Sequence, residues 1–232
     1  TDESGNTQTV AVELDVPNLL RVTAQTQGAK YIWAMDTAGT SQPNYGDGGT
    51  LALTLTDARA TTAQDGAEGR FPLTDIFNDR ASVSVAATSN MSIVVCVNLT
   101  EITATRAIFS GNNYGNNANP GYISITSGSA LAYRTNNLGS TVTVEASPTT
   151  GVWLLALTIN SSGDANIYAR KVGSSLVSQS FSRGAAVSGT DTYILGGNGS
   201  NYFSAPGDYY FFAIYDSVIG TTEFNDLYAS IG

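Results

Sequence analysis

Short runs in which apolar and polar residues alternate recur along most of the chain, while the 3.6-residue period of an amphipathic helix is nearly absent. Alternation with period two and many β-branched residues is typical of strands with one buried face. Clusters rich in Gly, Asn and Ser separate the runs and favour turns. The strands that we expect are Thr9–Val16, Thr50–Leu55, Ala81–Ala87, Ser92–Leu99, Ala107–Ser110, Tyr122–Thr126, Ala130–Arg134, Ser140–Glu145, Val152–Asn160, Ala165–Lys171, Ser174–Phe181, Thr192–Leu195 and Asp208–Tyr215.

A dozen or so short strands joined by polar turns predict an all-β fold, an antiparallel β-sandwich or jelly roll. One short helix is expected near the C-terminus, where Thr221 is placed to cap the segment Thr222–Tyr228. Phe224, Leu227 and Tyr228 share one face of that helix. We therefore expect the helix to pack on the sandwich and to close the fold.

The first thirty residues differ from the rest of the chain. Pro17 interrupts the strand-like pattern that precedes it, and Gln25–Lys30 has the composition of a linker. We interpret residues 1–30 as an arm or edge strand outside a main domain that spans residues 31–232. Such an arm can add to the exposed sheet edge of a neighbour, and a frayed tail is the alternative interpretation.

The composition excludes several classes of function. Charged residues make up only 12% of the chain and hydrophobic residues 42%, so the polar surface depends on Ser, Thr, Asn and Gly. A formal net charge of -9 disfavours nucleic acid as a partner, and no apolar run approaches the ~18 residues of a membrane span. The chain has no histidine, which excludes Ser-His triads and most zinc sites. Cys96 is the single cysteine, lies among valines, and is expected to be a small buried hydrophobic residue.

The order of elements in the second half of the chain carries a resemblance to a known family. A strand led by Trp153 is followed by a hairpin partner that contains Tyr168, and a short helix ends the series. The segments that carry the resemblance are Val152–Ile159, Ala165–Arg170, Tyr193–Gly197, Gly207–Asp216 and Glu223–Tyr228, with looser matches at Tyr31–Asp36, Gly48–Thr54 and Ser92–Val97. Over residues 31–232 the chain resembles the concanavalin A-like lectin/glucanase superfamily, in its laminin G-like branch.

The resemblance implies a jelly-roll sandwich, but it does not imply one activity. This fold carries lectins, glucanases, adhesins and virus particle proteins. The sequence also departs from the family at one hairpin, because Tyr168 is followed by Ala169–Gly173 in place of the usual turn. Loop residues of the family are therefore not carried over to this chain.

Two loops have the composition of a sugar-binding surface. Sugars are bound by aromatic faces surrounded by planar amides and small polar groups. The candidate sugar-binding residues are Asn112, Asn113, Tyr114, Asn116, Asn119 and Tyr122 in one loop and Asn198, Asn201 and Tyr202 in the other. Two alternatives stay open: Asn and Gly also favour turns, and Tyr114 and Tyr202 could pack against a neighbouring subunit.

Acidic residues offer only weak candidates for metal binding or catalysis. Asp36 and Asp47, with Asn44, flank a Gly-rich loop, and Asp208 lies beside another loop, so calcium is a conceivable ligand. Solvated loop acids are the simpler interpretation. Glu13 and Asp15 are the one pair of acids at alternate positions, as in a retaining glucanase, but they precede the domain and lack a third acid. We therefore expect a protein that is not an enzyme.

These observations together favour a non-enzymatic virion structural protein, either a bacteriophage capsid-decoration protein or a tail-fibre component. We expect residues 1–30 to contact other virion proteins, the loops to adhere to host-surface glycans, and several copies to assemble as a homo-oligomer. A secreted bacterial carbohydrate-binding module or adhesin domain, extracellular or on the cell surface, is the alternative.

Overall fold

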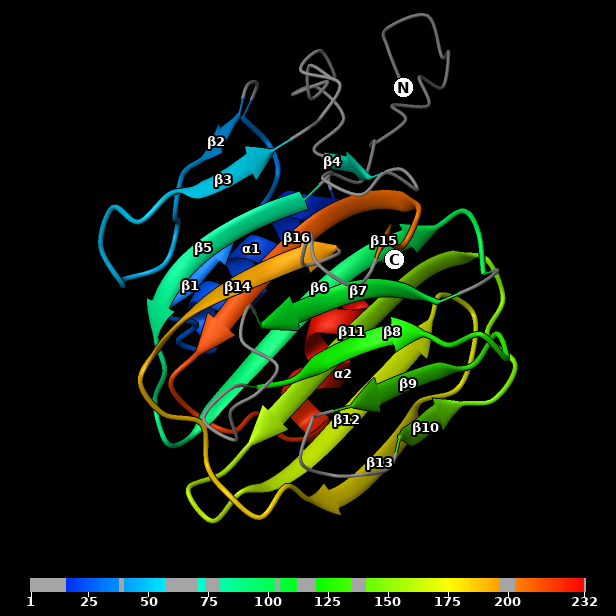
Figure 1. The fold of residues 1–232 in the computed structure, drawn as a ribbon. Coiled ribbons are helices and arrows are strands. Elements are labelled where there is room, and N and C mark those ends of the chain that lie inside the picture. Colours follow the sequence, from blue (N-terminus) through cyan, green and yellow to red (C-terminus); the bar gives the residue numbers. More distant parts are fainter. Residues whose placement is uncertain are drawn as a thin grey trace, which may run out of the picture.

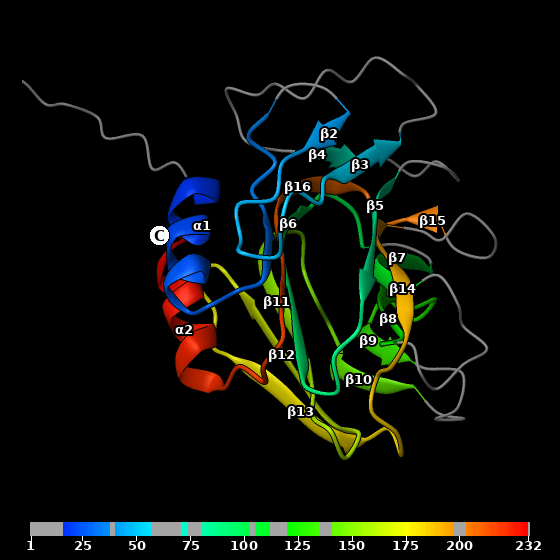
Figure 2. The ribbon, with the colours of Figure 1, turned by 90° about the vertical axis from the view of Figure 1, so that its left-hand side faces the viewer.

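Two antiparallel β-sheets pack face to face, and two helices cover the outer face of one of them (Figures 1 and 2). The computed structural model describes residues 16–37, 40–56, 71–73, 80–102, 105–111, 120–134, 141–196 and 203–231. The all-β sandwich and the C-terminal helix predicted from the sequence are confirmed. Residues 9–15 of the first expected strand lie outside the described residues.

The sheet under the helices, here called sheet A, has seven strands in the order β1-β16-β6-β11-β12-β13, with β4 also paired to β16. Its strands are β1 (Tyr31–Trp33), β4 (Phe71–Leu73), β6 (Met91–Leu99), β11 (Gly151–Ile159), β12 (Asp164–Lys171), β13 (Val177–Ser182) and β16 (Gly207–Tyr215). The chain leaves and re-enters this sheet repeatedly, so its central strands are far apart in sequence.

The second sheet, sheet B, has nine strands in the order β10-β9-β8-β7-β14-β5-β3-β2, with β15 also paired to β7. Its strands are β2 (Ser41–Gln42), β3 (Leu53–Thr56), β5 (Arg80–Ala86), β7 (Arg106–Gly111), β8 (Tyr122–Ile125), β9 (Leu131–Arg134), β10 (Val142–Glu145), β14 (Thr190–Gly196) and β15 (Phe203–Ser204). Strands of two or three residues, such as β2, β4 and β15, are too short to produce a recognisable alternating pattern and were not among the expected strands.

The centre of sheet A is buried on both faces, which explains the continuous apolar run of β6. Alternate residues of β6, such as Ile93 and Val95, belong to the core between the sheets. Val94 and Cys96 point the other way, into a second core under the helices. Strands covered on both sides lose the polar half of the alternating pattern, so the run reads as uniformly hydrophobic.

The first helix, α1 (Val16–Thr26), occupies the segment for which the sequence predicts an edge strand and the start of a linker. That interpretation is wrong for residues 16–26. A proline is tolerated in the first turn of a helix, and Leu20 and Ala24, four residues apart, are both fully buried in the core that α1 shares with sheet A. Gly28 follows the helix in the left-handed region, at φ 77, as is common just after a helix C-terminus.

The C-terminal helix, α2 (Thr221–Ala229), lies beside α1 on sheet A (Figure 2). Its N-cap is Gly220 and not Thr221: the Gly220 amide donates a hydrogen bond to the Glu223 carboxylate at 2.9 Å. Phe224 is fully buried, and its ring stacks on Tyr168 of β12 at a centroid distance of 5.4 Å. Among the described residues, no helix has the length and apolar character needed to cross a membrane.

The neighbouring residues Leu19 and Leu20 give a direct test of how α1 packs. Leu20 is 0% exposed and Leu19 is 40% exposed. We expect Leu20→Ala to lower the free energy of unfolding by about 2–5 kcal/mol, because it leaves a cavity in the core under the helices. The matched control Leu19→Ala should change it by less than about 0.5 kcal/mol. Urea denaturation followed by tryptophan fluorescence measures both, and equal effects would contradict the observed register of α1.

Candidate functional site

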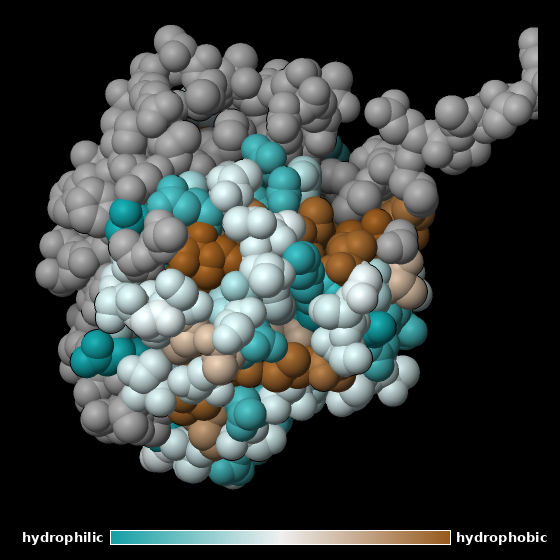
Figure 3. Space-filling view, turned by 90° about the vertical axis from the view of Figure 1, so that its right-hand side faces the viewer, coloured by the Kyte–Doolittle hydropathy of each residue, from teal (hydrophilic) through white to brown (hydrophobic). Residues whose placement is uncertain are grey.

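A pocket of about 300 Å³ opens where the turn between β10 and β11 meets the turn between β12 and β13. Figure 3 shows the side of the molecule on which β10 and β13 lie; its surface is mostly of intermediate or polar hydropathy, with separate apolar patches. Half of the residues that line the pocket carry hydroxyl groups, namely Ser147, Thr149, Ser174 and Ser175. The others are Glu145, Trp153, Lys171 and Val177.

Trp153 supplies the aromatic part of the pocket. The residue belongs to the core between the sheets and is only 4% exposed. Its indole N–H donates a hydrogen bond to the backbone carbonyl of Thr149 at 2.9 Å, which fixes the β10–β11 turn against the ring. Because most of the ring is buried, a ligand can touch only a small part of it.

Lys171 lies directly opposite Trp153 in the ladder between β11 and β12. Its Nζ donates a hydrogen bond to the hydroxyl of Thr149 at 2.7 Å. Gly151 makes this position possible: its φ is 126, and a Cβ built on it would lie 2.7 Å from Cε of Lys171. A larger residue at position 151 would therefore displace the Lys171 side chain, so the position of Lys171 depends on Gly151.

Glu145 ends β10 just after an irregularity in its pairing with β9. One of its carboxylate oxygens accepts a hydrogen bond from the backbone amide of Ser147 at 3.0 Å. Within the described part of the chain, neither Glu145 nor Lys171 takes part in an ion pair. The pocket therefore offers one carboxylate and one ammonium group whose strongest partners are neutral.

This set of groups is suited to binding and orienting a small polar molecule. Hydroxyl groups donate and accept hydrogen bonds, carboxylates only accept them, and ammonium groups only donate them. Hydrogen bonds to charged groups are also stronger than those between neutral groups. A ligand with several neighbouring hydroxyls can satisfy all three kinds of group at once.

Of the residues predicted to bind sugar, only Tyr122 is described. Asn112, Asn113, Tyr114, Asn116, Asn119, Asn198, Asn201 and Tyr202 lie outside the described residues, so their role stays a prediction. Tyr122 is the first residue of β8 and is 3% exposed. Its neighbours in the sheet are Ser110 of β7 and Arg134 of β9. It lies in a different sheet from most of the pocket and does not line it.

The ends of both predicted loops meet around β7. The segment 112–119 begins directly after β7 and is followed shortly by β8, which pairs with β7. The segment 197–202 is flanked by β14 and β15, and both of these strands also pair with β7. The topology therefore brings the stems of the two segments to the same strand of sheet B, although about eighty residues separate them in sequence.

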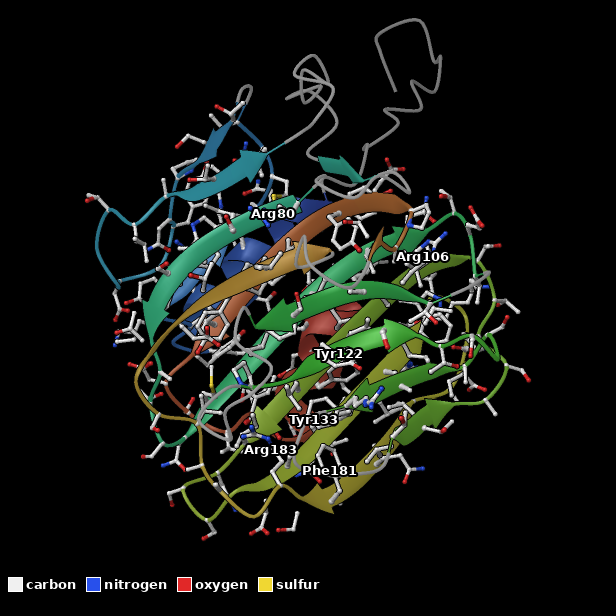
Figure 4. The ribbon with its side chains drawn as sticks, viewed as in Figure 1. Arg80, Arg106, Tyr122, Tyr133, Phe181 and Arg183 are labelled. Atoms are coloured by element: carbon white, nitrogen blue, oxygen red, sulfur yellow. The ribbon has the colours of Figure 1, made fainter. Side chains whose placement is uncertain are left out.

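Tyr133 of β9 links the two sheets close to Tyr122. Its hydroxyl donates a hydrogen bond to the carbonyl of Pro120 at 2.6 Å, and its ring lies 4.8 Å from the ring of Phe181 in β13. Burial raises the pKa of Tyr133 well above its usual value, although the nearby Arg183 acts in the opposite direction. Figure 4 shows Tyr133, Phe181 and Arg183 together in the lower part of the sandwich. These contacts fix the start of β8.

The calcium site suggested by the sequence is not assembled by the described residues. Asp36 forms an ion pair with Arg21 at 3.4 Å and accepts a hydrogen bond from the Tyr45 hydroxyl at 2.7 Å. Asp47 is exposed, and Asp208 lies in β16, paired in register with Asn98. The described residues contain no group of three or more His, Cys, Asp or Glu side chains that could hold a metal ion.

Asn44, the amide suggested as a further calcium ligand, is used by its own loop. Its side-chain oxygen accepts hydrogen bonds from the amides of Ile32 at 2.8 Å and Gly46 at 2.9 Å. Its side-chain nitrogen donates to the carbonyl of Gly49 at 2.7 Å. The Gly-rich loop is thus stabilised by this amide, with its oxygen already occupied.

Sequence reasoning missed Glu145 and Lys171 and used Trp153 only as a marker of the fold. One signal was available: the residues after Tyr168 depart from the hairpin turn of the family, and Lys171 lies within that departure. The chain has only two lysines, Lys30 and Lys171, so a lysine beside a tryptophan-led strand is an unusual feature of this sequence. Its convergence with Glu145 depends on the packing of β10 over β12 and could not be read from spacing.

Comparison with known proteins shows the fold and leaves the family open. No family model matches the chain, and no curated protein matches it by sequence. Among solved structures, Trypanosoma rangeli sialidase matches with a TM-score of 0.66 at 13% identity over 88% of this chain. The receptor-binding domain of botulinum neurotoxin type G matches with a TM-score of 0.56 at 15% identity over 87% of this chain, and the binding domain of serotype D matches with a TM-score of 0.61 at 12% identity over 90% of this chain.

This chain corresponds to only part of each of these structures. It covers 33% of the sialidase chain and 51% and 52% of the two neurotoxin domains. At such low identity the likeness shows a shared β-sandwich fold and nothing about individual residues. The architecture is therefore one that occurs as a unit within larger proteins.

The reactivity of the single thiol, Cys96, tests whether β6 is buried. Cys96 is 0% exposed, and burial raises the pKa of its thiol to about 12. Because the thiolate is the reactive form, we expect Ellman's reagent at pH 8 to modify the native protein about a thousandfold more slowly than the unfolded protein. Reaction of the native protein at the rate of a free thiol would contradict the burial of β6.

Proposed function

We propose that this protein is a non-enzymatic carbohydrate-binding domain and that the pocket between Glu145 and Lys171 is its sugar-binding site. One observation carries the proposal: hydroxyl groups, a carboxylate and an ammonium group converge beside a tryptophan in one pocket. Sugars present both apolar C–H faces and several adjacent hydroxyl groups, and this combination of groups matches both features.

The size and shape of the pocket support a small ligand or the end of a longer one. A volume of about 300 Å³ lies at the lower end of the range for small-molecule sites. Most of Trp153 is buried, so the hydrogen-bonding groups contribute more than stacking does. We expect weak binding of one or two sugar units, which several copies of the domain strengthen by avidity.

The acid in the pocket supports binding rather than hydrolysis as the proposed role. Glycosidases generally use two carboxyl groups, about 5 Å apart when they retain configuration and further apart when they invert it. Glu145 is the one acid among the residues that line this pocket, and Lys171 supplies an ammonium group to the same lining. Glu13 and Asp15, the pair considered from the sequence, lie outside the described residues.

The structural neighbours agree with this class of function. One similar structure is the receptor-binding domain of botulinum neurotoxin type G, and another is Trypanosoma rangeli sialidase in complex with sialic acid. These roles are those of the similar proteins. Because the fold is shared, we propose a role of the same class for this chain. We also propose that this sandwich is the concanavalin A-like jelly roll that the sequence resembles.

We further propose that the domain is a component of a bacteriophage particle, in which residues 1–30 contact other virion proteins through the segment before α1 and the exposed face of α1, which carries Leu19 and Val22. The Ser-, Thr- and Asn-rich composition, the buried single thiol and the compact sandwich support this setting over one that depends on disulfides. A secreted carbohydrate-binding module or adhesin is the alternative. Mass spectrometry of purified particles distinguishes the two, because only a virion component is recovered at a fixed ratio to the capsid protein.

The two lysines allow the site to be located within a single sample. Lys171 lines the pocket, whereas Lys30 pairs with Asp216 elsewhere on the surface. A glycan array identifies a bound sugar, and we then expect that sugar to slow acetylation of Lys171 by an amine-reactive ester while Lys30 reacts unchanged. Mass spectrometry of the digested protein measures both rates, and Lys30 is the internal control.

Substitution gives a second measure of the same site. Because a charge-assisted hydrogen bond contributes about 1.5–3 kcal/mol, we expect Lys171→Ala to weaken sugar binding by about 10- to 100-fold and Lys30→Ala to leave it unchanged. Loss of binding in Tyr114→Ala or Tyr202→Ala, with full binding in Lys171→Ala, would show instead that the loops predicted from the sequence bind the sugar.

A further inference from the structure

β13 is a border strand of sheet A, and no other strand among the described residues pairs with its outer edge. It pairs with β12 over six residues in unbroken register, from Val177 opposite Ala169 to Ser182 opposite Asp164. Figure 1 shows it as the outermost strand of the sandwich, and Ser178, Gln179 and Ser180 are exposed. An open edge presents a row of unpaired N–H and C=O groups that can pair with another strand.

The other border strands that the structure describes carry features that prevent such pairing. The free side of β1 is occupied, because Ile32 accepts a hydrogen bond from the Tyr45 amide at 2.8 Å and donates one to the Asn44 side chain at 2.8 Å. β10 is interrupted by a register shift between Thr143 and Glu145. β2 and β15 have two residues each, and β4 has three, one of them a proline.

β13 has none of these features. The stretch from Val172 to Ser182 contains no charged residue and no proline, although the chain as a whole has a formal net charge of -9. Natural sheets protect long edges with charges, prolines, bulges or short strands. A regular, neutral six-residue edge is therefore an exception in a protein that protects its other borders.

We propose that β13 pairs antiparallel with β13 of a second copy of this chain, so that sheet A continues through a two-fold axis. This inference does not depend on the proposed sugar site. Val177 and Phe181 pack toward the core between the sheets, so Ser178, Ser180 and Ser182 form a row on the opposite face. Antiparallel neighbours share a face, and of the registers that keep the serine rows together the two with the greatest overlap place Ser180 opposite either Ser180 or Ser178 of the second copy.

Charge supports a second copy of the chain as the partner. No charged residue lies on β13 itself, so the negative net charge is not concentrated at the contact. On β12, Asp164 lies at the Ser182 end of the edge and Arg170 beyond the Val177 end. A two-fold axis brings Asp164 of one copy and Arg170 of the other to the same end, about 14 Å apart across the two copies of β13, where their opposite signs reduce the repulsion between two negatively charged chains.

The small size of the contact sets the expected strength. Standard stable interfaces bury about 800 Å² on each partner, which is more than the edge of a single six-residue strand provides. We therefore expect a dimer that forms and dissociates with concentration. Each copy carries its pocket at the Val177 end of β13, so the dimer holds two pockets on one rigid sheet.

Sedimentation velocity of the full chain tests the proposal directly. We expect the mass to rise from that of the 24.2 kDa monomer toward twice that value as concentration increases, and hydrogen exchange at residues 177–182 to slow in parallel. A chain that stays monomeric up to about 1 mM, where a dimer of even millimolar Kd is well populated, would overturn the proposal.

Paired substitutions locate the contact. The double variant Ser178→Lys with Ser180→Lys places like charges opposite each other in either register, and we expect it to be monomeric. The control adds the same two charges to exposed positions near β10, as Thr141→Lys with Thr143→Lys, and should dimerise like the unmodified chain. If the Ser178/Ser180 variant dimerises as well as the control, β13 is not the interface.

A mixing experiment separates loss of pairing from damage to the fold. We expect Ser178→Glu with Ser180→Glu also to be monomeric by itself, and an equimolar mixture of the glutamate and lysine variants to regain dimers. Recovery on mixing requires both variants to be folded and to meet through β13. Failure of the mixture to form dimers, with both variants folded by circular dichroism, would also overturn the proposal.

Discussion

Burial of sheet A on both faces is the constraint on which the rest of the structure depends. β6 sends alternate side chains into two separate cores, one shared with sheet B and one shared with α1 and α2. Exposing either face to water is unfavourable, because each exposed apolar side chain raises the free energy of the folded state. The two helices are therefore a structural necessity for this sheet and form its second cover, as sheet B forms its first.

The same constraint explains where the candidate pocket lies. The centre of the sandwich is filled by large side chains such as Trp33, Tyr193 and Phe212, and the described pocket lies at its border. At the border of β10 and β13 the core ends on Trp153, and the turns beyond it carry mainly hydroxyl groups. The pocket is the point at which the apolar interior gives way to a polar rim.

The sequence was sufficient for the fold class and for most long strands, and the reason is visible in particular elements. The apolar run at Ser92–Leu99 and the Trp-led run at Val152–Asn160 both form central strands. A continuous hydrophobic segment bounded by turns is typical of a strand that is buried on both faces. α1 was missed because Pro17 was interpreted as the end of a strand, whereas a proline is also tolerated in the first turn of a helix whose Leu20 and Ala24 are buried. The pocket was missed because Glu145 and Lys171 meet through sheet packing, and the residues favoured instead fall mostly outside the described part of the chain.

The pairing of α1 with α2 also decides how this unit is presented when it is joined to something larger. Thr23 and Ser230 share a hydrogen bond of 2.7 Å, so the first helix and the last residues of the fold lie on the same side (Figure 2). A polypeptide fused before α1 or after α2 leaves from the helical layer, so the outer face of sheet B points away from the attachment, whereas the β12–β13 turn of the pocket contacts Tyr228 of α2. A tethered copy would therefore leave the outer face of sheet B free and hold its pocket close to the tether.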